Sequence, residues 1–164
     1  MKAADNPLLK PYIGRPAILD SNLLLLQWCA SFDRELVSSF KRLNCFQDED
    51  IELLAETLKV FSALRTTPHV LTEVSNLANS LPTWMKEDWA GHFSKQIEII
   101  SEQWIPAEKI AKSDFMALGL TDAALAELAT THVILTLDFP LSNWLESQRL
   151  NVINFTHLRS LWLE

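Results

Sequence analysis

The segment HVILTLD, residues 132–138, constrains the fold of this chain more than any other part of the sequence. It is a continuous run of β-branched and apolar residues, which is typical of a strand buried inside a parallel sheet. Shorter runs of the same kind lie at residues 17–19, just before Asp20, and at residues 151–155. Residues 69–71 are predicted to form a further short strand. Because parallel strands require crossover connections, we expect helices between them.

The remaining sequence has the apolar spacing of such helices. One is predicted over residues 23–32, after a cap-like turn at Asn22, and a mostly helical elaboration follows over about residues 33–64. A later helix carries Glu73. Further helices are predicted over residues 84–100, 105–119, 139–150 and the last residues, and Thr121 is expected to cap another that follows Gly119. This order predicts an α/β fold in which helices cover a short parallel sheet.

The composition is that of a single globular domain. The chain has 164 residues, 48% of them hydrophobic, so residues 1–164 are expected to form one domain around a sizeable core. The net charge of −7 argues against a protein that holds nucleic acid through a generally basic surface. Cys29 and Cys45 match no zinc-binding spacing, and we expect both to be buried reduced thiols.

No segment of the sequence has the pattern of an export signal or a membrane span. The first residues lack the apolar centre of a signal peptide, and no apolar run approaches the ~20 residues that a membrane helix needs. We therefore expect a cytoplasmic protein.

Acidic residues recur at the predicted ends of strands and starts of helices. Asp20 and Asp138 follow predicted strands, and Glu73 and Asp122 lie at predicted helix starts. Each acid alone is explained by a turn or by the dipole of a helix. Gathered at one sheet edge, they would repel, since two charges ~4 Å apart cost about 4 kcal/mol at an effective dielectric constant of ~20. A hard divalent cation, Mg²⁺ or Mn²⁺, is expected to offset that repulsion.

Four segments in order along the chain carry a resemblance to a known family. AILDSNLLL, TPHVLTEVSNLA, LGLTDAALAELA and VILTLDFPLSNWLESQRLNVINF resemble the successive signature segments of PIN domains. The resemblance extends from Ala17 to about Arg159. It implies a three-layer α/β fold and a single PIN-like domain.

The resemblance also implies an activity and its residues. PIN domains include Mg²⁺- or Mn²⁺-dependent endoribonucleases that hydrolyse RNA phosphodiester bonds. In many bacterial members they are VapC-like toxins of toxin–antitoxin pairs, so an antitoxin protein is an implied partner. The residues that match the family's catalytic and metal-binding acids are Asp20, Glu73, Asp122 and Asp138. The matching supporting residues are Asn22 and Thr136.

Two other functions are compatible with parts of the sequence. An aspartyl-phosphate enzyme is disfavoured, because Asn22 stands where a phosphatase has a second acid and no acid pair precedes Ala17 as in a receiver domain. A PIN-fold interaction module that keeps its acids but works only by binding a partner remains open.

Several other residue types carry weaker expectations. The histidines lack metal-ligand spacing, so we interpret them as structural or surface groups. Tryptophans are expected mainly in the core or in a homodimer interface, and the apolar stripe with Trp84 and Trp89 predicts such a homodimer. Basic residues could line a groove for the RNA backbone, although the sequence does not say which share a face: Lys10, Arg15, Arg34, Lys41, Arg42, Arg65, Lys86 and Lys95.

Overall fold

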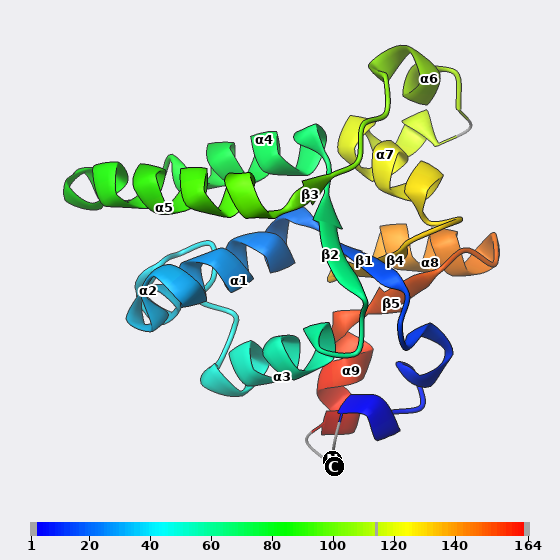
Figure 1. Cartoon of the computed structure of the whole chain (residues 1–164), viewed down its shortest axis with the longest axis horizontal. Coiled ribbons are helices and arrows are strands. Elements are labelled where there is room, and N and C mark those ends of the chain that lie inside the picture. The colour runs from blue at the N-terminus through cyan, green and yellow to red at the C-terminus, as the bar shows by residue number, and fades with distance from the viewer. Residues whose placement is uncertain (1–2, 114, 163–164) are drawn as a thin grey trace.

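The computed structural model describes residues 3–113 and 115–162, and within them the chain forms a five-stranded, all-parallel sheet. The strand order is β3-β2-β1-β4-β5 (Figure 1). The strands are β1 (Pro16–Leu19), β2 (Ala63–Thr66), β3 (Ser101–Glu102), β4 (Val133–Thr136) and β5 (Val152–Asn154). The predicted α/β class with a short parallel sheet is therefore confirmed.

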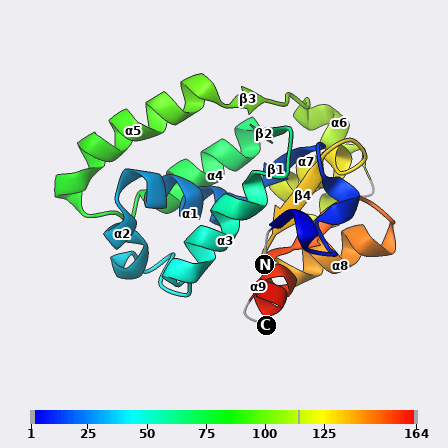
Figure 2. The same cartoon turned by 60° about the horizontal axis from the view of Figure 1, so that its bottom comes forward.

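Helices connect all neighbouring strands along the chain. They are α1 (Ser21–Phe32), α2 (Arg34–Ser39), α3 (Asp48–Leu58), α4 (Pro68–Ala78), α5 (Lys86–Ile99), α6 (Ala107–Ala111), α7 (Leu120–Leu128), α8 (Phe139–Ser147) and α9 (Phe155–Trp162). Short 3-10 turns are η1 (Ala3–Asp5), η2 (Lys10–Tyr12), η3 (Thr83–Met85) and η4 (Met116–Leu118). Figures 1 and 2 show α3 and α9 on one side of the sheet and α7 and α8 on the other. None of the described helices is long and apolar enough to cross a membrane.

The centre of the core is the pair of strands β1 and β4. Ala17 and Ile18 lie beside Val133 and Ile134 in register, and all these side chains are fully buried. Helix α1 starts directly after β1, and its leucines at positions 23–26 are all buried as well. Four consecutive leucines point to all sides of a helix and must be covered on all sides, and α1 packs against α2, α3, α4 and α5 as well as β1 and β4.

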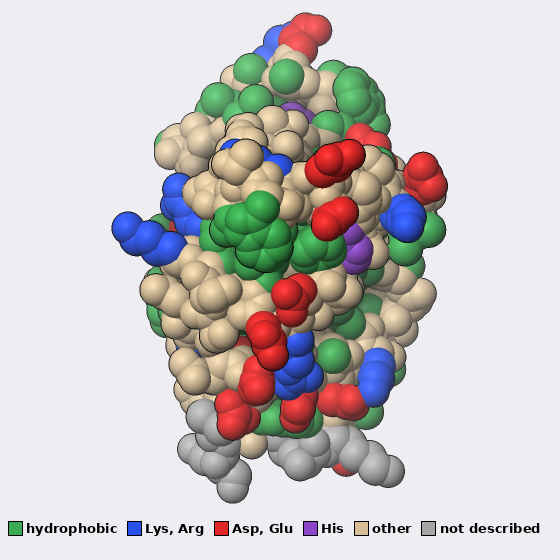
Figure 3. Space-filling view, turned by 90° about the vertical axis from the view of Figure 1, so that its left-hand side faces the viewer, with side chains coloured by type: hydrophobic (Ala, Val, Ile, Leu, Met, Phe, Trp, Pro, Cys, Tyr) green, Lys and Arg blue, Asp and Glu red, His purple; other side chains and the backbone are tan. Residues whose placement is uncertain are grey.

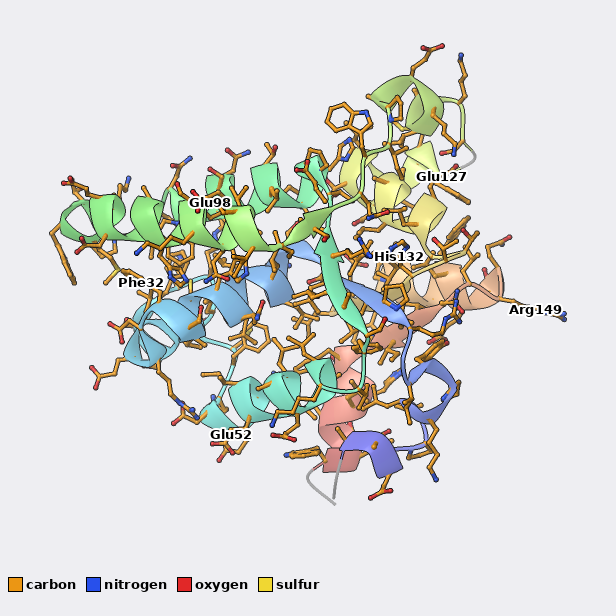
Figure 4. The ribbon with its side chains drawn as sticks, viewed as in Figure 1. Phe32, Glu52, Glu98, Glu127, His132 and Arg149 are labelled. Carbon is orange, nitrogen blue, oxygen red and sulfur yellow. The ribbon has the colours of Figure 1, made fainter. Side chains whose placement is uncertain are left out.

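An aromatic cluster joins α1 to α5 away from the sheet. The ring of Phe32 meets Trp89 edge-on at a centroid distance of 5.7 Å, and Trp28 meets Phe93 at 5.3 Å. Figure 4 shows Phe32 at the end of α1 that faces α5. Trp89 is therefore buried in the chain's own core, whereas Trp84 lies in η3 and is 78% exposed. Of these two tryptophans, only Trp84 is therefore accessible to the predicted homodimer interface.

The expectation of a strand at residues 69–71 is wrong. The strand is β2, and Thr67 ends the extended segment by capping α4: its hydroxyl oxygen accepts a hydrogen bond from the Val70 amide at 3.2 Å. Pro68 then occupies the first turn of the helix, where its missing N–H costs nothing. The Thr-Pro pair therefore marks a helix start.

The expectation of one helix over residues 105–119 is also wrong. Helix α6 ends at Ala111, and η4 precedes Gly119; Asp114 lies outside the described residues. The Ser113 hydroxyl donates to the Ile110 carbonyl and accepts from the Phe115 amide, local bonds that compete with a continuous helix. Gly119, at φ 93°, is the N-cap residue of α7, so Thr121 lies inside the helix and is not its cap.

The two cysteines differ in their environments. Cys29 is buried in α1, as expected, and burial raises the pKa of its thiol to about 12. Cys45 is exposed, contrary to expectation, because it lies in the turn before α3 and not on the apolar face of a helix. Both are free thiols.

Candidate functional site

The four sequence-predicted acids line one pocket of about 320 Å³. They are Asp20, Glu73, Asp122 and Asp138. The pocket lies at the carboxyl ends of β1 and β4, where connections leave in opposite directions: β1 leads to β2 on one side, and β4 leads to β5 on the other. Such a switch point leaves a crevice between neighbouring crossovers, which is where open parallel sheets bind ligands. Within the described residues, no Lys, Arg or His lines this pocket.

Asp20 is the most deeply held of the four acids. It caps α1, with one carboxylate oxygen accepting from the Leu23 amide at 2.8 Å. The other oxygen accepts from the Thr136 hydroxyl at 2.6 Å and from the Leu137 amide at 2.9 Å. Burial raises the pKa of Asp20, although these hydrogen bonds to the carboxylate oppose that rise. The side chain is therefore fixed in one orientation.

Thr136 connects Asp20 to Asp138. Its hydroxyl donates to Asp20 and accepts from the backbone amide of Asp138 at 2.9 Å. Asp138 itself caps α8, since one carboxylate oxygen accepts from the Leu141 amide at 2.8 Å. Unlike Asp20, Asp138 is exposed at the pocket mouth.

Glu73 reaches the pocket from the middle of α4 and not from its start as expected. It is the sixth residue of that helix, and Ser21 at the start of α1 holds it: the Ser21 hydroxyl donates to a Glu73 carboxylate oxygen at 2.6 Å. Sequence reasoning missed Ser21. A signal was present, because a hydroxyl residue directly after Asp20 starts α1 at the edge where the acids gather.

Asp122 lies in the first turn of α7, as expected, and its pKa is raised to about 6. Burial is the largest cause, and the charges of Asp138, Glu73 and Asp20 add to it. No described residue donates a hydrogen bond to its carboxylate. Asp122 is thus the acid on which the repulsion of the other three is concentrated.

The remaining supporting residue, Asn22, lines the pocket and is exposed. Its side chain forms no hydrogen bond with the described residues, so it stands open to a ligand. Thr136, by contrast, is fully buried beneath the acids.

The chemistry of this donor set suits a hard divalent cation. Carboxylate oxygens are the ligands that Mg²⁺ and Mn²⁺ prefer, and the mutual repulsion at Asp122 is what a cation would relieve. The side chains are not gathered tightly around one point, however. Among residues 3–113 and 115–162, no three Asp, Glu, His or Cys side chains form a ready-made group for one ion.

Comparisons with known proteins add no relative. No protein-family model, no curated protein sequence and no solved structure matches this chain.

Proposed function

We propose that this chain is a PIN-like, metal-dependent endoribonuclease that uses the acidic pocket to hydrolyse phosphodiester bonds. The observation that carries the proposal is Asp122, whose pKa is raised to about 6 partly by three carboxylates from other elements. Clustering acids in this way lowers the stability of a fold unless the site is used with a cation. The order of the four acids along the chain, which resembles that of PIN domains, favours RNA as the substrate.

In this proposal Asp20, Asp122 and Asp138 hold Mg²⁺ or Mn²⁺, and Glu73 completes the donor set. A divalent cation at such a site supplies charge for the phosphate oxygens and acidifies water. The chain's own residues supply orientation. Thr136 and the Leu137 amide fix Asp20, the Leu141 amide fixes Asp138, and Ser21 fixes Glu73. The pocket has a volume of about 320 Å³, and among the described residues that line it there is no Lys, Arg or His, so the charge that binds a phosphate group would come from the metal ion.

The test is a cleavage assay on labelled single-stranded RNA in Mg²⁺, Mn²⁺ or chelator, with single-stranded and duplex DNA as further substrates. Asp138→Asn is the most informative variant, because asparagine caps a helix as well as aspartate does and α8 should stay intact. Asp48→Asn, in an exposed acid outside the pocket, is the matched control. Metal-dependent cleavage that Asp138→Asn abolishes and Asp48→Asn preserves supports the proposal.

One observation favours the second candidate, a PIN-fold interaction module without catalysis: no three acids of the described residues are gathered tightly enough for one ion. Thermal melts with and without Mn²⁺ separate the two. Stabilisation by metal in the wild type, lost in Asp138→Asn, supports a metal site independently of any cleavage. A chain that neither cleaves RNA nor responds to metal contradicts the nuclease and favours the interaction module.

An antitoxin partner is a further part of the proposal that rests on the resemblance alone. Its test is co-expression with the neighbouring reading frames. A small protein that co-purifies with this chain and suppresses its cleavage of RNA would establish the pair.

A further inference from the structure

A groove at the opposite end of α1 from the acidic pocket has the opposite charge. It has a volume of about 850 Å³ and lies between the end of α2 and the turn that joins α4 to α5. Lys41 and Arg42 line it together with Phe40, Trp84 and Met85, and within the described residues no acid does. Figure 1 shows these elements at the left end of the molecule.

The two cations of this groove are free to meet a ligand. Both are exposed, and no ion pair within the described part of the chain involves either of them. Arg34, on α2 nearby, is by contrast paired with Asp48 and Glu52. Figure 3 views this end of the molecule: Lys and Arg side chains lie to the left of a central hydrophobic patch without carboxylates around them, whereas the Lys and Arg side chains below the patch and to its right lie among most of the carboxylates of this face.

Trp84 is held out into water by a fixed turn. Its side chain is 78% exposed, although Leu81 and Met85 on either side are buried and anchor η3. The acids nearest to it in sequence, Glu87 and Asp88, belong to the first turn of α5 and do not line the groove. The result is a flat aromatic face beside two free positive charges.

We propose that this groove binds single-stranded nucleic acid, with a base stacked on Trp84 and the adjoining phosphates at Lys41 and Arg42. An exposed aromatic ring next to cations is the usual arrangement for an unpaired strand, since every base has a face that stacks. A second copy of the chain fits less well. A symmetric dimer formed through this groove would bring the Lys41 and Arg42 pairs of both copies together.

Calling the bound strand a substrate rests on the proposed function. Asp20 caps the start of α1 and the groove lies beyond the end of that helix, which has 12 residues and is therefore roughly 18 Å long at 1.5 Å per residue. A strand bound at both places would therefore contact the groove at nucleotides that are several positions away from the bond that is cut. The groove would contribute affinity without touching the reacting phosphate.

The experiment measures binding in chelator, where cleavage plays no part. Fluorescence anisotropy of a labelled 12-nucleotide oligouridine RNA is followed as the protein concentration rises. Trp84→Ala should weaken binding by roughly five- to hundredfold, and Trp84→Phe should restore most of the loss. Lys41→Ala with Arg42→Ala should also weaken it, and should make the slope of log K against log salt less negative by about 1.4, as expected for two phosphate contacts.

Control variants remove one exposed tryptophan, or two exposed positive charges, elsewhere on the surface. Trp104→Ala deletes a tryptophan that is 75% exposed, and the double change Lys10→Ala, Lys109→Ala deletes two exposed lysines outside the groove. These variants should bind oligouridine like the wild type. Circular dichroism establishes that every variant is folded.

Several results would overturn the inference. They are groove variants that bind like the wild type, a wild type that binds no oligouridine, and a duplex that competes as well as a single strand. A dimer in sedimentation that Trp84→Ala dissociates would assign the groove to a second copy instead. The two proposals fail separately. Binding without metal-dependent cleavage contradicts only the nuclease, whereas normal binding by the groove variants, with cleavage that depends on Asp138, contradicts only the groove.

Discussion

The hydroxyl of Thr136 donates a hydrogen bond of 2.6 Å to the carboxylate of Asp20, across 116 positions of sequence. This contact joins the ends of the neighbouring strands β1 and β4 and is fully buried. Since Thr136 also accepts from the Asp138 amide, one side chain sets the positions of two acids.

Replacing Thr136 with valine keeps the shape of the side chain and removes both hydrogen bonds. The buried Asp20 carboxylate then loses a hydrogen-bond donor, so its pKa should rise further. The free energy of unfolding, measured in urea, should fall by about 1–3 kcal/mol. We also expect weaker stabilisation by Mn²⁺ and slower RNA cleavage, because Asp20 is less often charged and less firmly oriented.

Thr66→Val is the control for that variant. Thr66 ends the neighbouring strand β2 and is equally buried, but its hydroxyl has no partner among the described residues. Removing it should leave stability unchanged or slightly raised. Equal losses in the two valine variants would show that the Thr136 contacts are unimportant.

The Ser21 to Glu73 hydrogen bond predicts a variant that affects cleavage more than stability. Ser21→Ala frees a carboxylate that is otherwise exposed, so the free energy of unfolding should fall by only about 0.5–1.5 kcal/mol. Cleavage should fall severalfold, because Glu73 then samples other rotamers. Ser75 is an exposed serine that lies on α4, the helix of Glu73, but outside the pocket. Ser75→Ala should therefore change neither measurement. If Ser21→Ala cleaves like the wild type, Ser21 does not position Glu73 for catalysis.

The strands that the sequence predicts correctly are those whose own residues form a continuous apolar run. β1 and β4 are buried on both faces, so their sequences are purely apolar up to the polar residue at the end. β2 has the sequence ALRT and is mostly half-buried, and β3 is two exposed residues at the sheet edge. Neither β2 nor β3 has a residue pattern that distinguishes it from a loop, because each is extended only through its pairing with a neighbouring strand.

The candidate site divides in the same way. Asp20 and Asp138 could be placed at the sheet edge because Asp20 directly follows β1 and Asp138 follows β4 after one intervening residue. The position of Glu73 depends on how α4 packs against α1, which is a tertiary relationship. The sequence therefore predicts the helix that carries Glu73, but it does not predict that Glu73 lies in the middle of that helix. The sequence places Trp84 and Trp89 on one apolar helical stripe, but Trp84 lies in η3 and Trp89 in α5, so the two side chains do not share one helical face.

The ion pair between Arg159 and Asp50 predicts a stability effect that is separate from the acidic pocket. The guanidinium of α9 donates two bonds, of 2.6 and 2.7 Å, to the buried Asp50 carboxylate at the start of α3. Arg159→Ala leaves that carboxylate with the Gln47 amide as its remaining donor and should destabilise the fold by about 3 kcal/mol in denaturant unfolding. Arg34→Ala, which breaks only exposed pairs, should have a small effect. Similar effects of the two variants would contradict the burial of the Asp50 pair.

The metal-free protein should lose stability as pH rises. The pKa of Asp122 is about 6 in the folded chain, against about 3.9 for an unperturbed aspartate, so the folded state holds its proton more tightly than the unfolded state. The raised pKa of Asp20 acts in the same direction. Stability from this cluster is present below about pH 4 and is lost as pH rises through about 6. Melting temperatures in chelator between pH 4 and pH 7 measure it, and a flat profile would contradict the clustering.

Asp122→Asn removes the most repelled of the four charges. In chelator at pH 7 the variant should be as stable as the wild type or more stable, with a weaker dependence on pH. Asp88→Asn is the control: it also removes a first-turn acid, at α5 and outside the pocket, so it should lose only the helix-dipole interaction, typically about 0.3–1 kcal/mol. Divalent metal at ten times its dissociation constant should stabilise the wild type and Asp88→Asn by about 1.4 kcal/mol, and Asp122→Asn less. If Asp122→Asn instead behaves like Asp88→Asn in both chelator and metal, then Asp122 serves only the start of α7.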